Sequence, residues 1–179
     1  MSPLPEHLSD GRLVLRRADP ADVDELSAGV LESVAELSPW MPWASPAYDR
    51  RAAATFLATT WLAWNAQTGF EFVVRDALDR RFLGVCGLNG IDRDNRRANL
   101  GYWVRSPEAG EGVASAAAKL VSDFGINQLK LSRVRIFHAV GNVGSGRVAQ
   151  KAGFQREGVL RSRLILHDVA HDAVIWSRI

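Results

Sequence analysis

Residues 101–124, GYWVRSPEAGEGVASAAAKLVSDF, constrain the fold of this chain more than any other stretch. Tyr102, Trp103 and Val104 are aromatic or β-branched and favour a strand, which Pro107 ends. Gly110 and Gly112 then indicate a tight loop. From Val113 onward, apolar residues recur at spacings of three and four, which predicts a helix with one buried face. The stretch therefore predicts a strand, a glycine-rich turn and a helix in direct succession.

A glycine-rich turn that leads into a helix leaves several backbone N–H groups unpaired and pointing the same way. Such a turn can bind an anion, and phosphate suits it well. The same pattern also fits an ordinary strand-to-helix turn, because a single G-x-G is a weak signal. This loop alone leaves both interpretations open.

Composition limits the class of protein. The 179 residues fit one domain, residues 1–179, with a sizeable core, and 47% apolar with 23% charged residues is typical of a soluble globular chain. A formal net charge of +2 is too small to argue for nucleic-acid binding. No apolar run reaches the ~20 residues of a membrane span, and residues 1–12 lack the features of a secretory signal. The single cysteine, Cys86, excludes an internal disulfide, so we expect a cytoplasmic protein.

The rest of the chain alternates between predicted strands and helices. The strands cover residues 11–17, 70–75, 82–91, 97–105, 133–140, 160–166 and 170–179. The helices cover residues 20–34, 49–66, 113–124 and 143–151. This order predicts an α+β fold with an antiparallel meander over 70–105 and a closing hairpin across His167 and Asp168. One right-handed crossover makes 100–105 and 133–140 parallel neighbours.

Five stretches carry a recognisable pattern, in the order LVLRRADPADVDEL, SPWMPW, RRANLGYWV with GEGVASAAAKLV, HAVGNVGSGRVAQKAGF and HDVAHDAVIWSRI. Together they resemble the GNAT superfamily of acyl-CoA N-acyltransferases, and within it the RimJ/RimL-like protein N-acetyltransferases. The most specific signal is the fourth stretch, which matches the group's N-x-x-S-x-R-V-x-x-K-x-G-F run. The resemblance covers nearly the whole chain. It implies the GNAT fold, a mixed, mostly antiparallel twisted sheet of about seven strands with helices on both faces.

The chain departs from the family pattern in the loop. The family usually has Arg or Gln where this chain has Ala109, and often a basic residue where it has Glu111. A carboxylate beside a pyrophosphate is repulsive, by about 1 kcal/mol at ~4 Å in water. Backbone N–H groups do not depend on side chains, so the loop can still bind phosphate. The residues expected to do so are Gly110, Gly112, Val113 and Ala114.

The resemblance implies acetyl-CoA as co-substrate, no metal, and direct transfer in a ternary complex. The acceptor would be a primary amine, either a protein N-terminal α-amine, as in ribosomal-protein acetylation, or a small amine. Acetyl-CoA would lie in a splay between the strands ending at Val104 and His138, held by strand N–H groups near Trp103 and Val104. A catalytically weak or inactive acyl-CoA-binding or regulatory module is the alternative, which Ala109 and Glu111 favour.

Amine acylation requires that the amine lose a proton and that the thiolate leave as a thiol. Glu71 lies between Phe70 and Phe72 in a predicted strand. If it faces a cleft, the aromatic surroundings raise its pKa and suit it to act as base through water; a solvent-facing residue is the alternative. Ser145, by resemblance, protonates the departing sulfur. The alternative is a serine without a role on a first helical turn.

Most of the remaining candidate site residues also have an ordinary structural interpretation. Asn142 could hydrogen-bond the pantetheine or cap a helix, and Arg147 could meet the 3′-phosphate or lie on a solvated face. Trp40 and Trp43 could wall the acceptor side, or pin their loop as buried rings. Asn89 could orient an acceptor amide.

Other reactive residues are expected to be structural. Cys86 fits a core thiol, and His138 and His171 lack metal-ligand spacing. The expected partners are acetyl-CoA and the amine acceptor, with no nucleic acid and no membrane. A homodimer is expected from the resemblance and from large apolar residues near the surface loops and the terminal hairpin.

Overall fold

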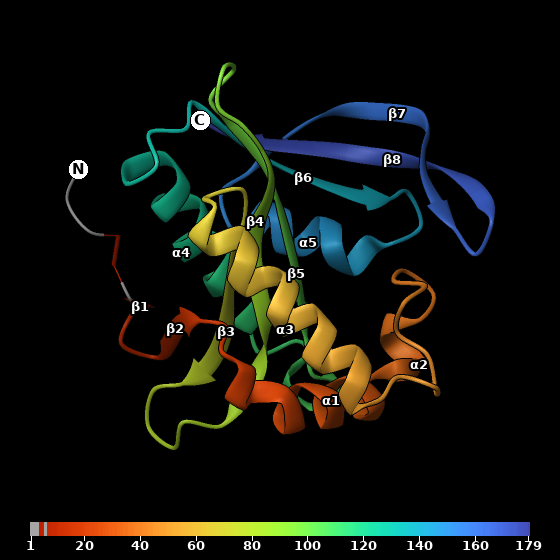
Figure 1. Cartoon of the computed structure of the whole chain (residues 1–179). Helices are drawn as coiled ribbons and strands as arrows, with labels where there is room; N and C mark the ends of the chain where they lie inside the picture. Colours follow the sequence, from red (N-terminus) through yellow and green to blue (C-terminus); the bar gives the residue numbers. More distant parts are fainter. Residues whose placement is uncertain (1–3, 6) are drawn as a thin grey trace.

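Eight strands form one mixed sheet in the computed structural model, which describes residues 4, 5 and 7–179 (Figure 1). The strands are β1 (His7–Ser9), β2 (Leu13–Arg17), β3 (Phe70–Asp76), β4 (Phe82–Asp92), β5 (Arg97–Val104), β6 (Arg133–Ala139), β7 (Gln155–Leu166) and β8 (Val169–Arg178). Their order across the sheet is β1-β2-β3-β4-β5-β6-β8-β7, and only β5 and β6 are parallel neighbours. The predicted α+β class, meander and parallel crossover are confirmed.

The sheet has one strand more than predicted, because β1 pairs with β2 at the N-terminal edge. Asp10 closes the turn between them, where its Oδ1 accepts hydrogen bonds from the N–H groups of Arg12 (3.0 Å) and Leu13 (2.7 Å). A three-residue edge strand is too short to show an alternating pattern, so the sequence gives no signal for it.

The closing hairpin turns where the sequence predicts. His167 and Asp168 have φ angles of 49° and 63°, as a tight two-residue turn requires. β7 begins at Gln155 rather than at residue 160, because its first residues are mostly polar and exposed and show no apolar alternation.

Helices cover both faces of the sheet. They are α1 (Val23–Glu32), α2 (Val34–Leu37), α3 (Arg50–Asn65), α4 (Val113–Asn127) and α5 (Val143–Lys151), with short 3-10 turns at Pro20–Asp22 and Ser106–Glu108. On one face, Leu88 and Leu100 pack against Phe124 of α4, and α5 lies beside α4. On the other face, Val85 and Trp103 pack under α1 and α3. Successive strand residues point to opposite faces, so each face buries its own apolar core.

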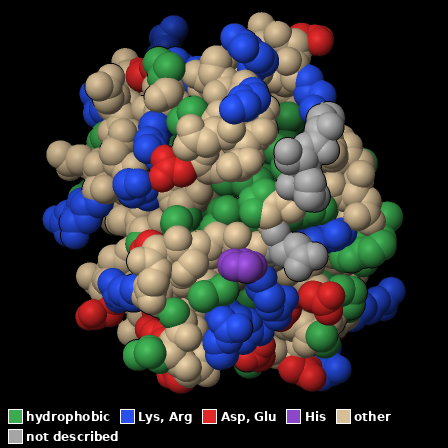
Figure 2. Space-filling model, turned by 90° about the vertical axis from the view of Figure 1, so that its left-hand side faces the viewer, with side chains coloured by type: hydrophobic (Ala, Val, Ile, Leu, Met, Phe, Trp, Pro, Cys, Tyr) green, Lys and Arg blue, Asp and Glu red, His purple; other side chains and the backbone are tan. Residues whose placement is uncertain are grey.

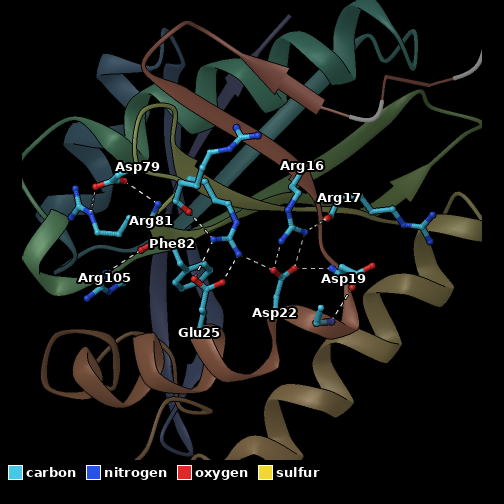
Figure 3. A network of polar contacts seen from close by, with 12 residues as sticks. Arg16, Arg17, Asp19, Asp22, Glu25, Asp79, Arg81, Phe82 and Arg105 are labelled. Carbon is cyan, nitrogen blue, oxygen red and sulfur yellow. Dashed lines mark hydrogen bonds and ion pairs between the residues drawn. The ribbon is translucent and has the colours of Figure 1, made fainter.

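A charge cluster joins α1 to the N-terminal half of the sheet. Arginines gather at this edge of the molecule, seen in Figure 2. The buried Asp22 carboxylate accepts hydrogen bonds from Arg16 of β2 and Arg75 of β3, with Oδ2–Nη1 and Oδ1–Nη2 distances of 3.0 Å, and Glu25 also pairs with Arg75 (Figure 3). Asp19 caps the turn before α1, since its side chain accepts from the Ala21 N–H. The cluster fixes α1 against β2 and β3.

The sheet opens between β5 and β6. These strands pair only at Arg97–Arg133, Ala98–Val134 and Asn99–Arg135. Beyond Asn99, β5 continues along β4 while β6 continues along β8, so the two strands diverge. This gap is the splay that the resemblance implies.

Residues 1–3 and Glu6, part of the stretch in which we expect no secretory signal, lie outside the described residues. No helix in the described part of the chain is long and apolar enough to cross a membrane.

Candidate active site

The predicted phosphate loop forms the turn into α4. Gly110 and Gly112 have φ angles of 88° and 79°, a left-handed conformation that side chains other than glycine rarely adopt. Gly112 is the N-cap of α4, and Glu111 between the two glycines is exposed. Val113 and Ala114 are buried in the first turn of the helix. The turn therefore has the backbone conformation that presents N–H groups to an anion.

Arg12 lies beside this loop and was not identified from the sequence. Its Nη1 is 3.9 Å from the position that a Cβ on Gly112 would occupy. Arg12 belongs to the turn between β1 and β2, a hundred residues earlier in the chain. No local pattern could indicate this contact, because it depends on how the N-terminal hairpin joins the sheet.

On the β5 side of the splay, the direction of each backbone N–H group determines whether it is free to contact the thioester. The Arg105 N–H donates to the Leu83 carbonyl of β4. Hydrogen-bonding groups alternate along a strand, so the Trp103 N–H also faces β4, whereas that of Val104 faces the gap. Of the two predicted thioester contacts, only the Val104 N–H is therefore open to the splay.

On the α5 side of the gap, Asn142 and Ser145 lie on the same helical turn. Asn142 is the N-cap of α5, since its Oδ1 accepts from the Ser145 N–H at 3.0 Å, and its amide NH₂ group remains for another partner. Ser145 Oγ lies 2.7 Å from the Tyr102 hydroxyl oxygen, across the gap on β5. Burial raises the pKa of Tyr102 to about 12, so the phenol keeps its proton. Arg147 is exposed further along α5.

Glu71 lies in a row with two glycines. The register places it opposite Gly87 of β4, which is opposite Gly101 of β5, so all three share one face of the sheet. The Glu71 carboxylate lies directly over Gly87, and any Cβ there would overlap it. Over Gly101 the space is open apart from the Asn89 Nδ2, 3.5 Å from a Cβ position. The row forms a channel from the carboxylate toward the splay.

Burial raises the pKa of Glu71 to about 8. The direction agrees with the sequence prediction, but the neighbours differ. Phe70 and Phe72 point to the opposite face, into the core under α4, because adjacent strand residues alternate. The rings on the Glu71 side include Trp103 of β5 and Phe56 of α3.

A cavity of about 790 Å³ lies over this channel. It is bounded by α1, α3, the segment before α3 and the floor of β3, β4 and β5. Its wall is mainly apolar, and its contributors include Leu26, Met41, Trp43, Tyr48, Phe56 and Trp103. Glu71 and Gly101 lie at its floor. The cavity can admit an apolar group whose amine reaches the carboxylate.

The two tryptophans of the SPWMPW stretch lie in different environments. Trp43 lines the cavity and packs edge-on against Trp103, with ring centroids 6.3 Å apart. Trp40 instead lies against Gly141, outside the cavity lining, with Cη2 3.4 Å from a Cβ position. Both rings are more than one third exposed, so the alternative of two buried rings that pin the loop is wrong. The stretch is also tied to the terminal hairpin, because His167 Nε2 lies 2.8 Å from the Ser38 carbonyl oxygen.

The remaining candidates have clear environments. Asn89 lies at the exposed end of β4, and its Oδ1 accepts from Asn99 Nδ2 at 3.1 Å. His138 is buried; its Nε2 accepts from Trp176 Nε1 at 2.9 Å, so we assign the proton to Nδ1, which donates to the Ala139 carbonyl. This agrees with a structural role.

Cys86 is buried, and burial raises its pKa, as expected for a core thiol. Among residues 4, 5 and 7–179, no cluster of His, Cys, Asp or Glu could hold a metal ion.

Comparison with known proteins identifies the family. The profile described as an acetyltransferase (GNAT) domain matches residues 12–155. YdaF of Bacillus subtilis (strain 168), whose name assigns it provisionally to the ribosomal N-acetyltransferases, is 29% identical over 167 residues, which cover 92% of this chain and 90% of that protein. The ribosomal-protein-serine acetyltransferase of Escherichia coli (strain K12) is 29% identical over 113 residues, 63% of each chain.

Among solved structures, the ribosomal L7/L12 α-N-protein acetyltransferase RimL in complex with coenzyme A matches with a TM-score of 0.87. The match covers 98% of this chain and 97% of that chain at 24% identity, which supports the fold alone. The profile, however, spans most of the chain, and the sheet carries the splay and the glycine turn that the resemblance implies. This protein therefore belongs to the GNAT family of acetyltransferases.

Proposed function

We propose that this acetyltransferase transfers an acetyl group from acetyl-CoA directly to a primary amine while both substrates are bound. The observation that carries the proposal is the arrangement around the gap between β5 and β6. The glycine turn and α5 flank the gap on one face of the sheet, and Glu71 and the cavity approach it on the other. A donor and an acceptor entering from opposite faces would meet at Gly101 and Tyr102.

The residues present fit acetyl-CoA, which supplies the acetyl thioester when it is bound. The positive φ angles of Gly110 and Gly112 suit an anion-binding turn for the pyrophosphate, and Arg12 adds positive charge beside it. The Asn142 amide would hold the pantetheine, and the exposed Arg147 remains a candidate for the 3′-phosphate. The Val104 N–H, which faces the gap, would bind at the thioester, whereas the Trp103 backbone is paired with β4.

The side chains supply a proton path. Glu71, once ionised, takes a proton from the acceptor ammonium through a water over Gly101. Ser145 gives a proton to the departing sulfur and takes one from the Tyr102 phenol, whose oxygen lies 2.7 Å away; solvent then returns a proton to the phenol. The two groups lie on opposite sides of the splay, so proton removal and proton delivery do not compete for one residue.

We propose a protein N-terminal α-amine as the acceptor. The names of three similar proteins, YdaF, the Escherichia coli enzyme and RimL, refer to ribosomal acetylation. Trp43 would wall the acceptor site, and Asn89, at the end of the channel, would orient an acceptor amide. A small amine is the second candidate, and the apolar cavity favours one with an apolar body. With a ribosomal substrate the protein would act in the cytoplasm.

The competing function is an acyl-CoA-binding or regulatory module without turnover, which Ala109 and Glu111 favour. Two measurements separate the alternatives. A rise in melting temperature with acetyl-CoA reports binding to the native state. Thiol release in the presence of a panel of N-terminal peptides and small amines reports turnover. Stabilisation without turnover of any acceptor would support the module, and no stabilisation at millimolar acetyl-CoA would count against both functions.

A homodimer remains a prediction. The terminal hairpin exposes Val159, Leu160, Ile165 and Val169, each at least 38% accessible. Such residues suit a contact between two copies. Sedimentation at micromolar protein measures the oligomeric state, and a monomer alone would contradict the dimer.

A further inference from the structure

Two arginines flank Phe137 on the face of the sheet that carries Glu71. The Arg135 and Arg163 guanidinium carbons lie 5.5 Å and 4.7 Å from the Phe137 ring centroid. Arg135 pairs with Asn99, which pairs with Asn89, two residues along β4 from Gly87. Directly paired residues share a face, so these side chains lie on the acceptor face. We name Arg135, Phe137 and Arg163 the arginine clamp.

Within residues 4, 5 and 7–179, no helix packs over this half of the acceptor face. The helices that pack on β6 and β7 are α4 and α5, which lie on the other face. Figure 1 shows β7 and β8 extending away from α1 and α3. Phe137 and Arg135 are half-buried and Arg163 is exposed, so the clamp is open to a ligand.

The charge of the clamp is not balanced within the described part of the chain. Nearby Arg97 pairs with Asp92, and Arg133 pairs with Glu157. Arg135 and Arg163 form no ion pair there, and the Arg135 Nε is buried without a hydrogen-bond partner. Burial, followed by the charges of Arg97, Arg133 and Arg163, lowers the pKa of Arg135 and outweighs the smaller opposite effect of Asp92. An anion at this place would relieve that repulsion.

The Phe137 ring also organises the two cations. A guanidinium stacked on an aromatic face keeps its N–H edge free, and that edge matches a carboxylate in two-point contact. Two guanidinium groups stacked on one ring can each bind a carboxylate, and the two carboxylates can belong to one peptide. A small amine is too short to reach both the clamp and Glu71.

The position of the clamp sets which acceptor residues reach it. Arg135 stands opposite Asn99, which is two residues before Gly101 on β5. Strand spacings put the clamp about 8 Å from Gly101, a distance that two or three extended residues cover. An acceptor whose amine lies over Gly101 would therefore bring its second to fourth side chains to the clamp.

We propose that the preferred acceptor is a polypeptide N-terminus with acidic side chains at its second to fourth positions, bound by Arg135 and Arg163. The proposal rests on the proposed function, because it uses the channel from Glu71 to Gly101 as the place of the amine. A nucleic acid is a weaker fit, since its affinity comes from many neutralised phosphates and the clamp offers two unpaired cations.

Two peptides that share a first serine and differ only in the next three residues, Glu-Glu-Glu or Gln-Gln-Gln, test the proposal. Binding to the full chain with coenzyme A present is measured by fluorescence anisotropy of a C-terminal label, and turnover by thiol release. We expect the acidic peptide to bind about three- to tenfold more tightly at low salt, as two partly exposed ion pairs allow. The preference should appear in KM rather than in kcat, and should shrink with added salt.

The double variant Arg135→Gln/Arg163→Gln should lose the preference while it binds the neutral peptide as before. Arg156→Gln is the matched control, because Arg156 pairs with Trp176 on the opposite face of the hairpin, where Trp176 contacts His138. This control should keep the preference. Phe137→Leu retains both charges but removes the ring, and it should reduce the preference in part.

Equal binding of the two peptides by the wild type, or a preference that survives the double variant, would overturn the proposal. Turnover of small amines without binding of either peptide would overturn it too. A short oligonucleotide that binds through the clamp while the acidic peptide shows no preference would replace it with nucleic-acid binding. Clamp-dependent peptide preference without turnover of any acceptor would support the clamp and count against the proposed function instead.

Discussion

The Tyr102 hydroxyl oxygen and Ser145 Oγ are 2.7 Å apart, although the residues are separated by 43 positions in the chain. Their hydrogen bond joins β5 to α5 across the open part of the sheet. The Tyr102 hydroxyl oxygen also lies 3.2 Å from the Ser145 carbonyl oxygen, but the phenol has a single proton. When that proton is donated to Ser145 Oγ, the proton of the serine hydroxyl stays free for another acceptor. A serine held in this way can present its proton in one direction, whereas a free hydroxyl rotates.

Replacing Ser145 by Ala should lower kcat by ~10²-fold or more, because general acid catalysis contributes ~10²–10⁴-fold. The affinity for acetyl-CoA, measured by titration calorimetry, should change little, since Ser145 does not bind the phosphates. Tyr102→Phe should cause a smaller loss of kcat, because the serine hydroxyl remains but loses its fixed direction. A Ser145→Ala enzyme with wild-type kcat for its true acceptor would refute the assigned role.

The raised pKa of Glu71 predicts how the reaction rate depends on pH. With a pKa of about 8 in the free protein, most of the carboxyl is protonated at pH 7 and unable to accept a proton. We expect kcat/KM to rise with pH until it levels off above about 8. Glu71→Gln should lower kcat and remove this acidic limb. An unchanged limb in the variant would mean that it reports the amine's own pKa or another base.

Glu71 should also make folding stability depend on pH. Its ordinary pKa of 4.5 applies to the unfolded chain, and burial raises it to about 8 in the folded protein. Between these values the folded state holds a proton that the unfolded state has released, so the free energy of unfolding falls as pH rises. The stabilisation is complete below pH 4.5 and is lost as pH passes about 8.

Glu71→Gln removes this dependence because glutamine does not titrate. Thermal unfolding should therefore show the variant several degrees more stable than the wild type at pH 9, and close to it at pH 5. Asp94→Asn, in the exposed turn between β4 and β5, is the control and should shift the curves little at either pH. Equal melting temperatures of wild type and Glu71→Gln at pH 9 would show that the folded carboxyl is not strongly perturbed.

The sequence predicts the parts of this fold that local pattern determines. Helical spacing after Gly112 indicates α4, and the order of strands indicates the parallel crossover that creates the splay. The helix cap at Asn142 follows from side-chain chemistry near a glycine break, and the structure has it. The helix and its cap depend on residues within one or two turns of chain, and the crossover depends on the order of neighbouring elements along the chain.

The site needs information that no local pattern holds. Glu71 has a channel because Gly87 and Gly101 stand beside it in register, and register depends on three strands at once. The sequence explains its raised pKa by Phe70 and Phe72, but alternation sends those rings to the other face. Tyr102 shows only strand propensity in the sequence, and its contact with Ser145 appears once α5 is docked.

The loop charges give a final prediction, on acetyl-CoA affinity. Glu111 is exposed between Gly110 and Gly112, where its negative charge opposes a bound pyrophosphate, and Arg12 lies beside Gly112, where its positive charge favours one. Glu111→Gln should therefore tighten acetyl-CoA binding by about two- to fivefold at low salt, and Arg12→Gln should weaken it by a similar factor.

Titration calorimetry at low and high salt measures both effects, which should shrink as salt screens the charges. Asp94→Gln and Arg93→Gln, in the exposed turn between β4 and β5, make charge changes of the same sign away from the loop. If these distant changes had effects of equal size, the result would report net charge rather than position. If neither Glu111→Gln nor Arg12→Gln changed the affinity for acetyl-CoA, neither side chain would face the phosphates. The backbone N–H groups of the turn would then provide the binding.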